Sequence, residues 1–188
     1  MNRRDALSRV ALILGGTIIG AEAFLSGCKN PSSSAAGTFS ADDIAFLDEV
    51  GETILPATTT PGAKEAKIGQ FMKTIVTDCY EEKDQKIFAE GIGKLKEASK
   101  KKYSKDFMAL SAAEKHDLLV ELDKEAKDYN KTKKEGAPNH YFAMVKQLTV
   151  WGYFTSEPGA TKALRYVPIP GHYDGNYPYK KGDKAWAL

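Results

Sequence analysis

The sequence predicts an all-α fold: an irregular bundle of about five helices, followed by an extended C-terminal strap rich in aromatic residues, proline and glycine. Two observations predict the bundle. Apolar residues recur at intervals of three and four along most of residues 40–155, and the alternation typical of strands is almost absent there. A third observation predicts the strap, defined as residues 156–188, because its prolines and glycines interrupt any long helix.

The first two helices follow from capping and periodicity. Ser40 is a suitable N-cap, and the acidic residues after it favour the positive end of the helix dipole. Pro56 ends this helix. In the second helix, which begins near Ile68, apolar residues keep helical spacing as far as Cys79. A reactive thiol needs a partly open, electropositive setting, so we expect Cys79 to be an inert cysteine of the core.

Three more helices complete the predicted bundle. The third runs from about Lys83 to Lys102. The fourth begins at Ser111, which forms a capping box with Glu114 ahead of a helical run of leucines. The fifth runs from about Asn139 to Thr155. Together with the strap, these helices predict one helical domain over residues 40–188.

The strap is too aromatic to be disordered, so it must lie against something. Two interpretations stay open at this point. The strap wraps around its own bundle, or its aromatic residues form a surface for a partner protein, where Tyr and Trp are over-represented. The candidate interface residues, from the strap and the helix before it, are Trp151, Tyr153, Phe154, Tyr166, Tyr173, Tyr177 and Trp186.

The first 27 residues have the three-part order of an export signal. Basic residues that include Arg3 and Arg4 come first, an apolar run from Val10 to Ala21 follows, and small residues precede Cys28. Glu22 interrupts the apolar run before it reaches the about 20 residues that a membrane-spanning helix needs. We therefore expect a removable signal.

Two motifs specify the kind of signal. Arg3 and Arg4 resemble a twin-arginine motif, although the large apolar residue often found at the Ala6 position is missing. Leu25-Ser26-Gly27-Cys28 resembles a bacterial lipobox, in which the thiol of Cys28 is acylated and this residue becomes the new N-terminus. The expected location is a bacterial membrane, with the lipid as anchor and the domain facing the periplasm.

Residues 28–39 are small and polar without periodicity, which predicts a flexible tether. The rest of the chain is long enough for one domain with its own core. The whole chain of 188 residues has 27 basic and 25 acidic residues, a net charge of +2. This near balance gives no support for a nucleic-acid partner.

The sequence contains no pattern typical of a catalytic or metal site. Its three histidines, His116, His140 and His172, are far apart in the chain, and there is no HExxH, GxSxG or CxxCH motif. We therefore expect no catalytic residue, no metal and no cofactor in this chain. One alternative is an enzyme in its own right, for which His172 and Asp174 are the only pair worth testing.

The segment GYFTSEPGATKALRYVPIPG, from Gly152 to Gly171, is the most specific motif of the chain. With FMALSAAEKHDLLVELD and the arginine pair, it resembles the gluconate 2-dehydrogenase subunit 3 family, the small or gamma subunit of membrane-associated flavoprotein dehydrogenases. The resemblance spans about Phe39 to Leu188. It implies that the chemistry belongs to a separate large subunit of the GMC oxidoreductase type, which holds FAD and oxidises a sugar, sugar acid or glycoside.

The resemblance also implies a cytochrome subunit with haem c in many complexes, and an export signal that the small subunit supplies for the large one. The leading hypothesis is a non-catalytic, lipid-anchored subunit that escorts a flavin-dependent carbohydrate dehydrogenase. The lipobox departs from the simplest form of the family, in which the signal carries no lipid. A second hypothesis is a stand-alone lipoprotein that binds carbohydrate with Trp151, Tyr166, Tyr173 and Trp186.

Overall fold

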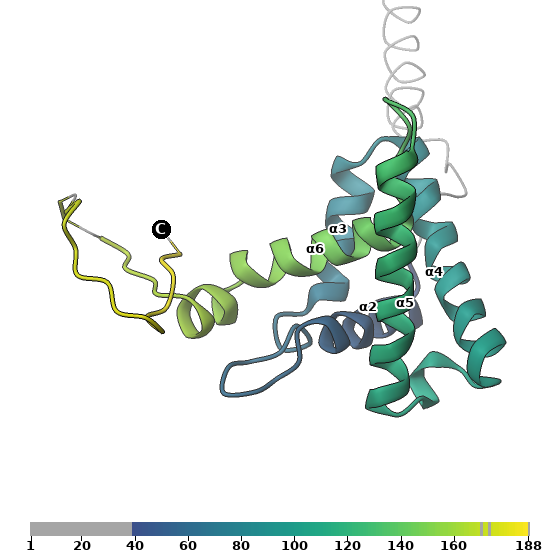
Figure 1. Cartoon of the computed structure of the whole chain (residues 1–188), viewed down its shortest axis with the longest axis horizontal. Helices are drawn as coiled ribbons and strands as arrows, with labels where there is room; N and C mark the ends of the chain where they lie inside the picture. The colour runs from purple at the N-terminus through teal and green to yellow at the C-terminus, as the bar shows by residue number, and fades with distance from the viewer. Residues whose placement is uncertain (1–38, 170, 173, 188) are drawn as a thin grey trace, which may run out of the picture. The chain divides into compact units, whose positions relative to one another are not determined.

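The computed structural model describes residues 39–169, 171–172 and 174–187, all of which belong to one compact unit. Five α-helices form a bundle (Figure 1): α2 (Ala41–Ile54), α3 (Ile68–Cys79), α4 (Glu82–Tyr103), α5 (Ala112–Thr132) and α6 (Tyr141–Thr155). A short 3-10 helix (Phe107–Ala109) joins α4 to α5, and a π-helical turn (Gly159–Ala163) follows α6. The described residues contain no strand beyond one isolated bridge, so the all-α prediction is confirmed.

Helix α6 is the central element of the bundle, because it contacts all four other helices. Its buried side chains meet a core to which every helix contributes. The largest fully buried side chains include Phe88 of α4, Phe107 of the 3-10 helix and Phe142 of α6. Helix α6 is also the last helix before the strap, so the central helix of the bundle is directly connected to it.

Two helices begin with capping boxes: the sequence predicts the box at Ser111, and at Ser40 it predicts the N-cap alone. At α2, the Ser40 hydroxyl accepts a hydrogen bond from the Asp43 N–H at 3.1 Å, and the Asp43 carboxylate accepts one from the Ser40 N–H at 3.2 Å. Ser111 and Glu114 make the same reciprocal pair at α5. Each box satisfies N–H groups that have no partner inside the helix, so these boundaries are fixed locally.

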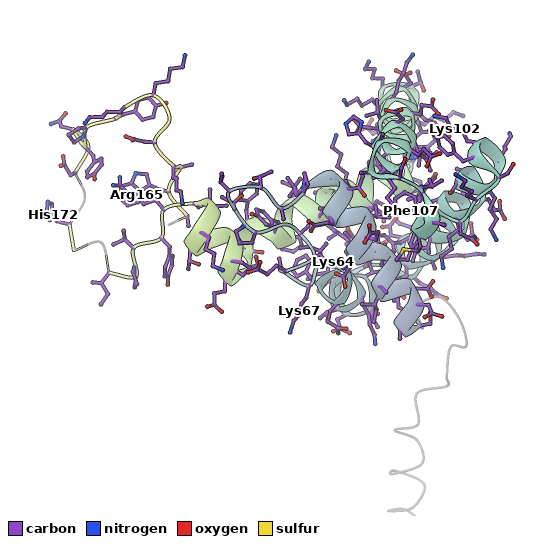
Figure 2. The ribbon with its side chains drawn as sticks, turned by 90° about the horizontal axis from the view of Figure 1, so that it is seen from below. Lys64, Lys67, Lys102, Phe107, Arg165 and His172 are labelled. Carbon is purple, nitrogen blue, oxygen red and sulfur yellow. The ribbon has the colours of Figure 1, made fainter. Side chains whose placement is uncertain are left out.

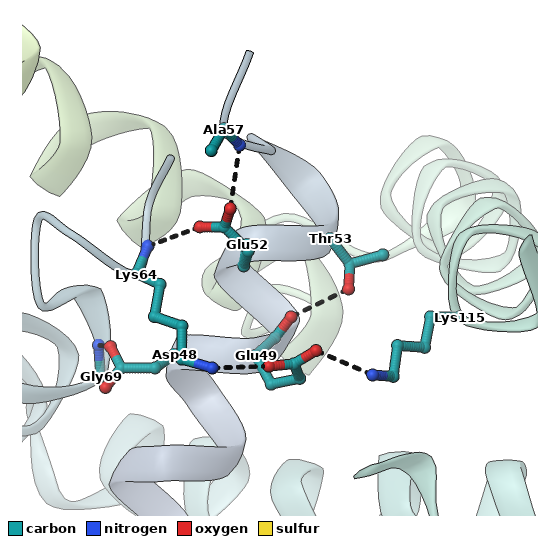
Figure 3. A network of polar contacts seen from close by, with 8 residues as sticks. All are labelled: Asp48, Glu49, Glu52, Thr53, Ala57, Lys64, Gly69 and Lys115. Carbon is teal, nitrogen blue, oxygen red and sulfur yellow. Dashed lines mark hydrogen bonds and ion pairs between the residues drawn. The ribbon is translucent and has the colours of Figure 1, made fainter. Parts of the chain in front are cut away.

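The acidic side chains of α2 hold the neighbouring segments in place (Figure 3). The Glu49 carboxylate accepts hydrogen bonds from Lys115 of α5 at 2.7 Å and from Lys64 at 3.0 Å. The carboxylates of Asp48 and Glu52 accept backbone N–H groups from the start of α3 and from the α2–α3 loop. This network ties the α2–α3 loop and α5 to α2.

Two predictions about burial are wrong. Cys79 is exposed, because the buried line of α3 advances in steps of four, Ile68, Met72 and Val76, and its next member is the half-buried Tyr80. Phe39, assigned to the tether, belongs to the buried core and meets the Phe88 ring edge-on at 5.9 Å. The packed domain thus includes at least one residue before Ser40.

Candidate partner-binding surface

Helix α6 carries apolar residues on all sides, yet the chain covers only part of it. One side, which includes Phe142, Val145 and Leu148, is buried in the core. On the other side, Val150, Trp151 and Phe154 are between 37% and 48% exposed. We call these three residues the open side of α6. Gln147 is an exposed polar residue on the same side, but three exposed apolar residues beside it give the open side the composition of a surface that a partner covers.

Trp151 is held in a defined orientation on the open side. Its ring meets the Phe71 ring of α3 edge-on, at 5.3 Å between centroids and 84° between planes. Phe71 reaches this position because residue 152 is glycine: a Cβ atom at Gly152 would lie 2.5 Å from the Phe71 ring. The tryptophan is thus prepared for contact and loses little freedom on binding.

A groove of about 450 Å³ lies beside the open side, between α5 and α6. Its lining includes Ala126, Ala143, Val150 and Trp151. At the rim, the Asp123 carboxylate binds Lys127 of α5 at 2.8 Å and Lys146 of α6 at 2.7 Å.

The charges on the rim of this groove are paired with one another, one carboxylate with two lysines, and leave one net positive charge. Burial by itself would raise the pKa of Asp123, but the hydrogen bonds from Lys127 and Lys146 outweigh it and lower the pKa. The carboxylate therefore stays ionised between two cations at neutral pH. Because the rim is internally paired, the groove favours an uncharged, apolar group over a strongly charged one.

Tyr153 does not belong to this surface, in contrast to the sequence-based assignment. Its side chain is 4% exposed and packs in the core, and its hydroxyl donates a hydrogen bond to the Pro61 carbonyl at 2.6 Å. Tyr153 is two positions from Trp151, which places the two side chains on nearly opposite sides of a helix with 3.6 residues per turn. Tyr153 thus anchors α6 to the α2–α3 loop.

The strap leaves α6 through a tight turn. A Cβ atom at Gly159 would lie 1.8 Å from the Tyr153 carbonyl oxygen, so only glycine fits there. The Ser156 hydroxyl donates to the same carbonyl at 2.6 Å and accepts from the Gly159 N–H at 3.2 Å. One turn later, Lys162 forms an ion pair with Glu65 of the α2–α3 loop at 3.1 Å. These contacts fix the direction in which the strap starts.

After Gly159, no described residue of the strap is buried. The strap therefore packs on its own bundle only in its first turn, where Gly159 is buried and Ala163 contacts the core, and not in the described residues from 165 onward. Tyr166, Tyr177 and Trp186 are exposed, and Tyr173 lies outside the described residues. The most exposed large apolar side chains of the described strap are Ile169 and Tyr179, at 85% and 79%, and the sequence did not single them out.

The three histidines lie on separate elements. His140 caps α6, because its Nδ1 accepts a hydrogen bond from the Phe142 N–H at 3.3 Å, and His116 is exposed on α5. His172 is exposed on the strap (Figure 2). Asp174 accepts a hydrogen bond from the Asn176 N–H at 2.9 Å. Among the interactions of the described residues, no hydrogen bond joins Asp174 to His172.

Within the described ranges, no three His, Cys, Asp or Glu side chains gather where they would hold a metal ion. None of the described helices combines the length and the apolar composition that crossing a membrane requires. The predicted export and lipid sites, Arg3, Arg4 and Cys28, lie outside the described residues. The described chain thus offers an apolar, aromatic surface as its main candidate site.

Fold and surface together define a class: a small helical domain that exposes one side of its central helix and an aromatic strap. The family model for gluconate 2-dehydrogenase subunit 3 matches residues 41–171, and the chain belongs to this family. The match includes all five α-helices, the turn at Gly159 and the first part of the strap. No curated protein and no solved structure shows significant similarity to the chain.

Family membership confirms the resemblance seen in the sequence. It also assigns a general role, because the family is defined as a subunit of gluconate 2-dehydrogenase. The chain is therefore a member of an oxidoreductase complex and associates with other dehydrogenase subunits. An exposed apolar helix side and an exposed aromatic strap are the features that such association requires.

Proposed function

We propose that this chain is the non-catalytic small subunit that binds the FAD-containing, GMC-type large subunit of a carbohydrate dehydrogenase and escorts it out of the cytoplasm. The observation that carries the proposal is the open side of α6, in a chain whose family is a dehydrogenase subunit. Large exposed apolar patches normally mark interaction sites. The exposure of Trp151 and Phe154 is therefore expected for a subunit that binds a partner, and less so for a protein that acts alone.

Escort explains why tight binding and an export signal occur in one chain. A large subunit that folds around its flavin cannot be threaded unfolded through the general secretion route. The signal must then be carried by a subunit that binds before export, and Arg3 and Arg4 provide a twin-arginine signal. In this arrangement FAD is held by the partner, and haem c by a third, cytochrome subunit where one is present. The present chain contributes the surface that binds the large subunit and the export signal.

The lipid anchor extends this role after export. Acylation of Cys28 attaches the chain to the membrane, and the small polar residues that follow it allow the domain to stand off the lipid surface. Because the partner binds the domain, the same lipid retains the catalytic subunit at the membrane. The dehydrogenase is thus retained at the membrane, on its periplasmic side.

Co-expression of the full chain with a GMC-type flavoprotein large subunit from the same genome tests the proposal. We expect the wild-type pair to yield a flavin-containing complex in the envelope fraction, and Arg3→Lys with Arg4→Lys to leave both proteins in the cytoplasm. Cys28→Ala serves as the matched control, because it removes the lipid without altering the arginines. Normal export of the flavoprotein in cells that lack this chain would contradict the escort role.

The same preparation separates the proposal from the carbohydrate-binding hypothesis. If the chain purifies without a flavoprotein and its thermal midpoint rises with free sugars, Trp151, Tyr166, Tyr173 and Trp186 become candidate sugar contacts. Absence of any sugar effect, together with a stable flavin-containing complex, supports the subunit role.

A further inference from the structure

We infer that Arg165 closes the strap into a preformed loop, and that this loop presents Ile169 and Tyr179 to an apolar hollow bordered by carboxylates on the catalytic subunit. The inference rests on the proposed function, because it specifies how the strap would contact that partner. It concerns residues 165–187, which we call the strap loop.

The two ends of the strap loop meet at Arg165 (labelled in Figure 2). The Arg165 N–H donates to the Ala185 carbonyl at 2.8 Å, and the Ala187 N–H donates to the Arg165 carbonyl at 2.9 Å. The guanidinium lies over the Trp186 ring at 4.6 Å and over the Tyr177 ring at 5.2 Å. Backbone and side chain of one residue therefore close the loop together.

The two rings also contact each other, which makes the closure a three-sided cluster. Tyr177 and Trp186 meet edge-on at 5.4 Å between centroids and 80° between planes. We call Arg165, Tyr177 and Trp186 the neck. A second link lies beside it, where the Lys184 ammonium donates to the Lys162 carbonyl. Since Lys162 is itself paired with Glu65, the neck is connected to the bundle.

The contacts of the neck do not contribute to the core of the bundle. No described residue of the strap loop is buried, so the loop adds no core and its closure rests on local contacts. Such contacts do have a use in binding, because a loop closed in advance does not lose that conformational freedom when the partner arrives. Tyr177 and Trp186 then serve to hold Arg165 and close the loop, whereas other residues of the loop contact the partner.

The residues that the closed loop presents are Ile169 and Tyr179, the two most exposed large apolar side chains among the described residues. Lone exposed apolar residues are common, but these two lie on one loop held shut by its neck. Ile169 is flanked by Pro168, and prolines limit the freedom of an extended segment. Both features fit anchor residues that enter an apolar hollow on another protein.

Charge on the loop indicates what surrounds that hollow. Lys180, Lys181 and Lys184 are close to Tyr179 in the chain, and all three are exposed. Asp174 and Asp183 also lie on the loop, and each accepts a backbone N–H, from Asn176 and Lys180 respectively. Cations thus exceed anions on the described loop, and carboxylates at the edge of the partner's hollow complement them.

Binding of the full chain to the co-expressed flavoprotein subunit tests this inference. We expect Ile169→Ser with Tyr179→Ala to raise the dissociation constant about 30-fold, the effect typical of losing interface anchors. Arg165→Ala should raise it about tenfold through loss of closure, and Arg165→Lys should give an intermediate value because the cation is kept. Met108→Ala, at an apolar position outside the strap that is 50% exposed, should leave it unchanged.

A second readout reports closure without the partner. In the wild-type chain, ring currents from Tyr177 and Trp186 should shift the side-chain protons of Arg165 upfield in NMR spectra, and Trp186→Leu should remove most of the shift. A merely structural role for Arg165 in the bundle would not produce this signature. A wild-type spectrum without the shift would overturn the neck.

The outcomes separate this inference from the proposed function. If the wild-type chain binds the flavoprotein but the Ile169/Tyr179 variant binds within twofold of it, the loop contacts are wrong while the subunit role stands. If Trp186→Leu loses the upfield shift of the Arg165 protons and still binds as tightly as the wild type, closure has no role in binding. If the wild-type chain forms no complex at all, the proposed function fails, and the partner contacts fail with it.

Discussion

The helical bundle and the strap use the same residue types in opposite ways. In the bundle, aromatic side chains such as Phe88 and Phe142 are fully buried, and capping boxes fix the helix starts. In the strap, Tyr179 and Trp186 are exposed, and the chain is held by Arg165 between two rings. The bundle is therefore a scaffold stabilised by burial. The strap is instead shaped by local contacts, and its apolar side chains stay exposed and available to a partner protein.

Truncation of one aromatic residue in each region tests this contrast most strongly. Phe142→Ala should lower the free energy of unfolding by about 3–5 kcal/mol, because it leaves a cavity at the centre of the bundle. Tyr179→Ala should change it by less than about 0.5 kcal/mol, as for an exposed site. Chemical denaturation of both variants measures the difference. Equal losses would mean that the strap contributes to the core.

The junction between the two regions gives the next largest effect. Gly159→Ala places a Cβ against the Tyr153 carbonyl, and the forced backbone shift should cost about 1–3 kcal/mol. Gly93→Ala is the matched control, because a Cβ there meets nothing within 4 Å on α4. Denaturation should show a gain or no change for this control. If both variants behave alike, the turn at Gly159 does not constrain the strap.

The smallest effect concerns the charges that hold the bundle together. Hydrogen bonds from Lys115 and Lys64 lower the pKa of Glu49 below its ordinary value of 4.5. Because the folded state releases the proton more easily than the unfolded state, this stabilisation is present above about pH 4.5 and is lost as the pH falls.

Glu49→Gln should therefore lower the free energy of unfolding by about 1 kcal/mol at pH 7. It should also make stability less dependent on pH below 4.5, the ordinary pKa of this carboxyl. Thermal melts across pH 3–7 measure both effects, with Glu90→Gln on the exposed face of α4 as control. An unchanged acid slope in the Glu49 variant would show that other carboxylates dominate.

Sequence reasoning succeeded where the determinants were local. Ser40 and Ser111 start their helices because the acidic residue three positions later completes each capping box, and the apolar periodicity located all five helices. The family was also visible in the strap motif, which includes Gly159 and Arg165. These features depend on neighbours within a few residues.

The errors arose where burial depends on the exact direction of a side chain around its helix, or where a contact joins residues far apart in the sequence. Cys79 keeps helical spacing, but the buried line of α3 continues to Tyr80 instead. In α6, which is apolar on all sides, periodicity cannot tell the buried Tyr153 from the exposed Trp151. The neck joins Arg165 to Trp186 across the whole loop, and no short pattern encodes that contact. The roles of Arg3, Arg4 and Cys28 stay predictions.

The central claim is that the open side of α6 binds the catalytic subunit. Its most direct test is the dissociation constant of the complex between the full chain and the co-expressed flavoprotein, compared for Trp151→Ala with Phe154→Ala and for the Met108→Ala control. Thermal melts confirm that each variant is folded. We predict that the double variant binds at least about 30-fold more weakly while the control is unchanged. Wild-type affinity in a folded double variant would contradict the claim.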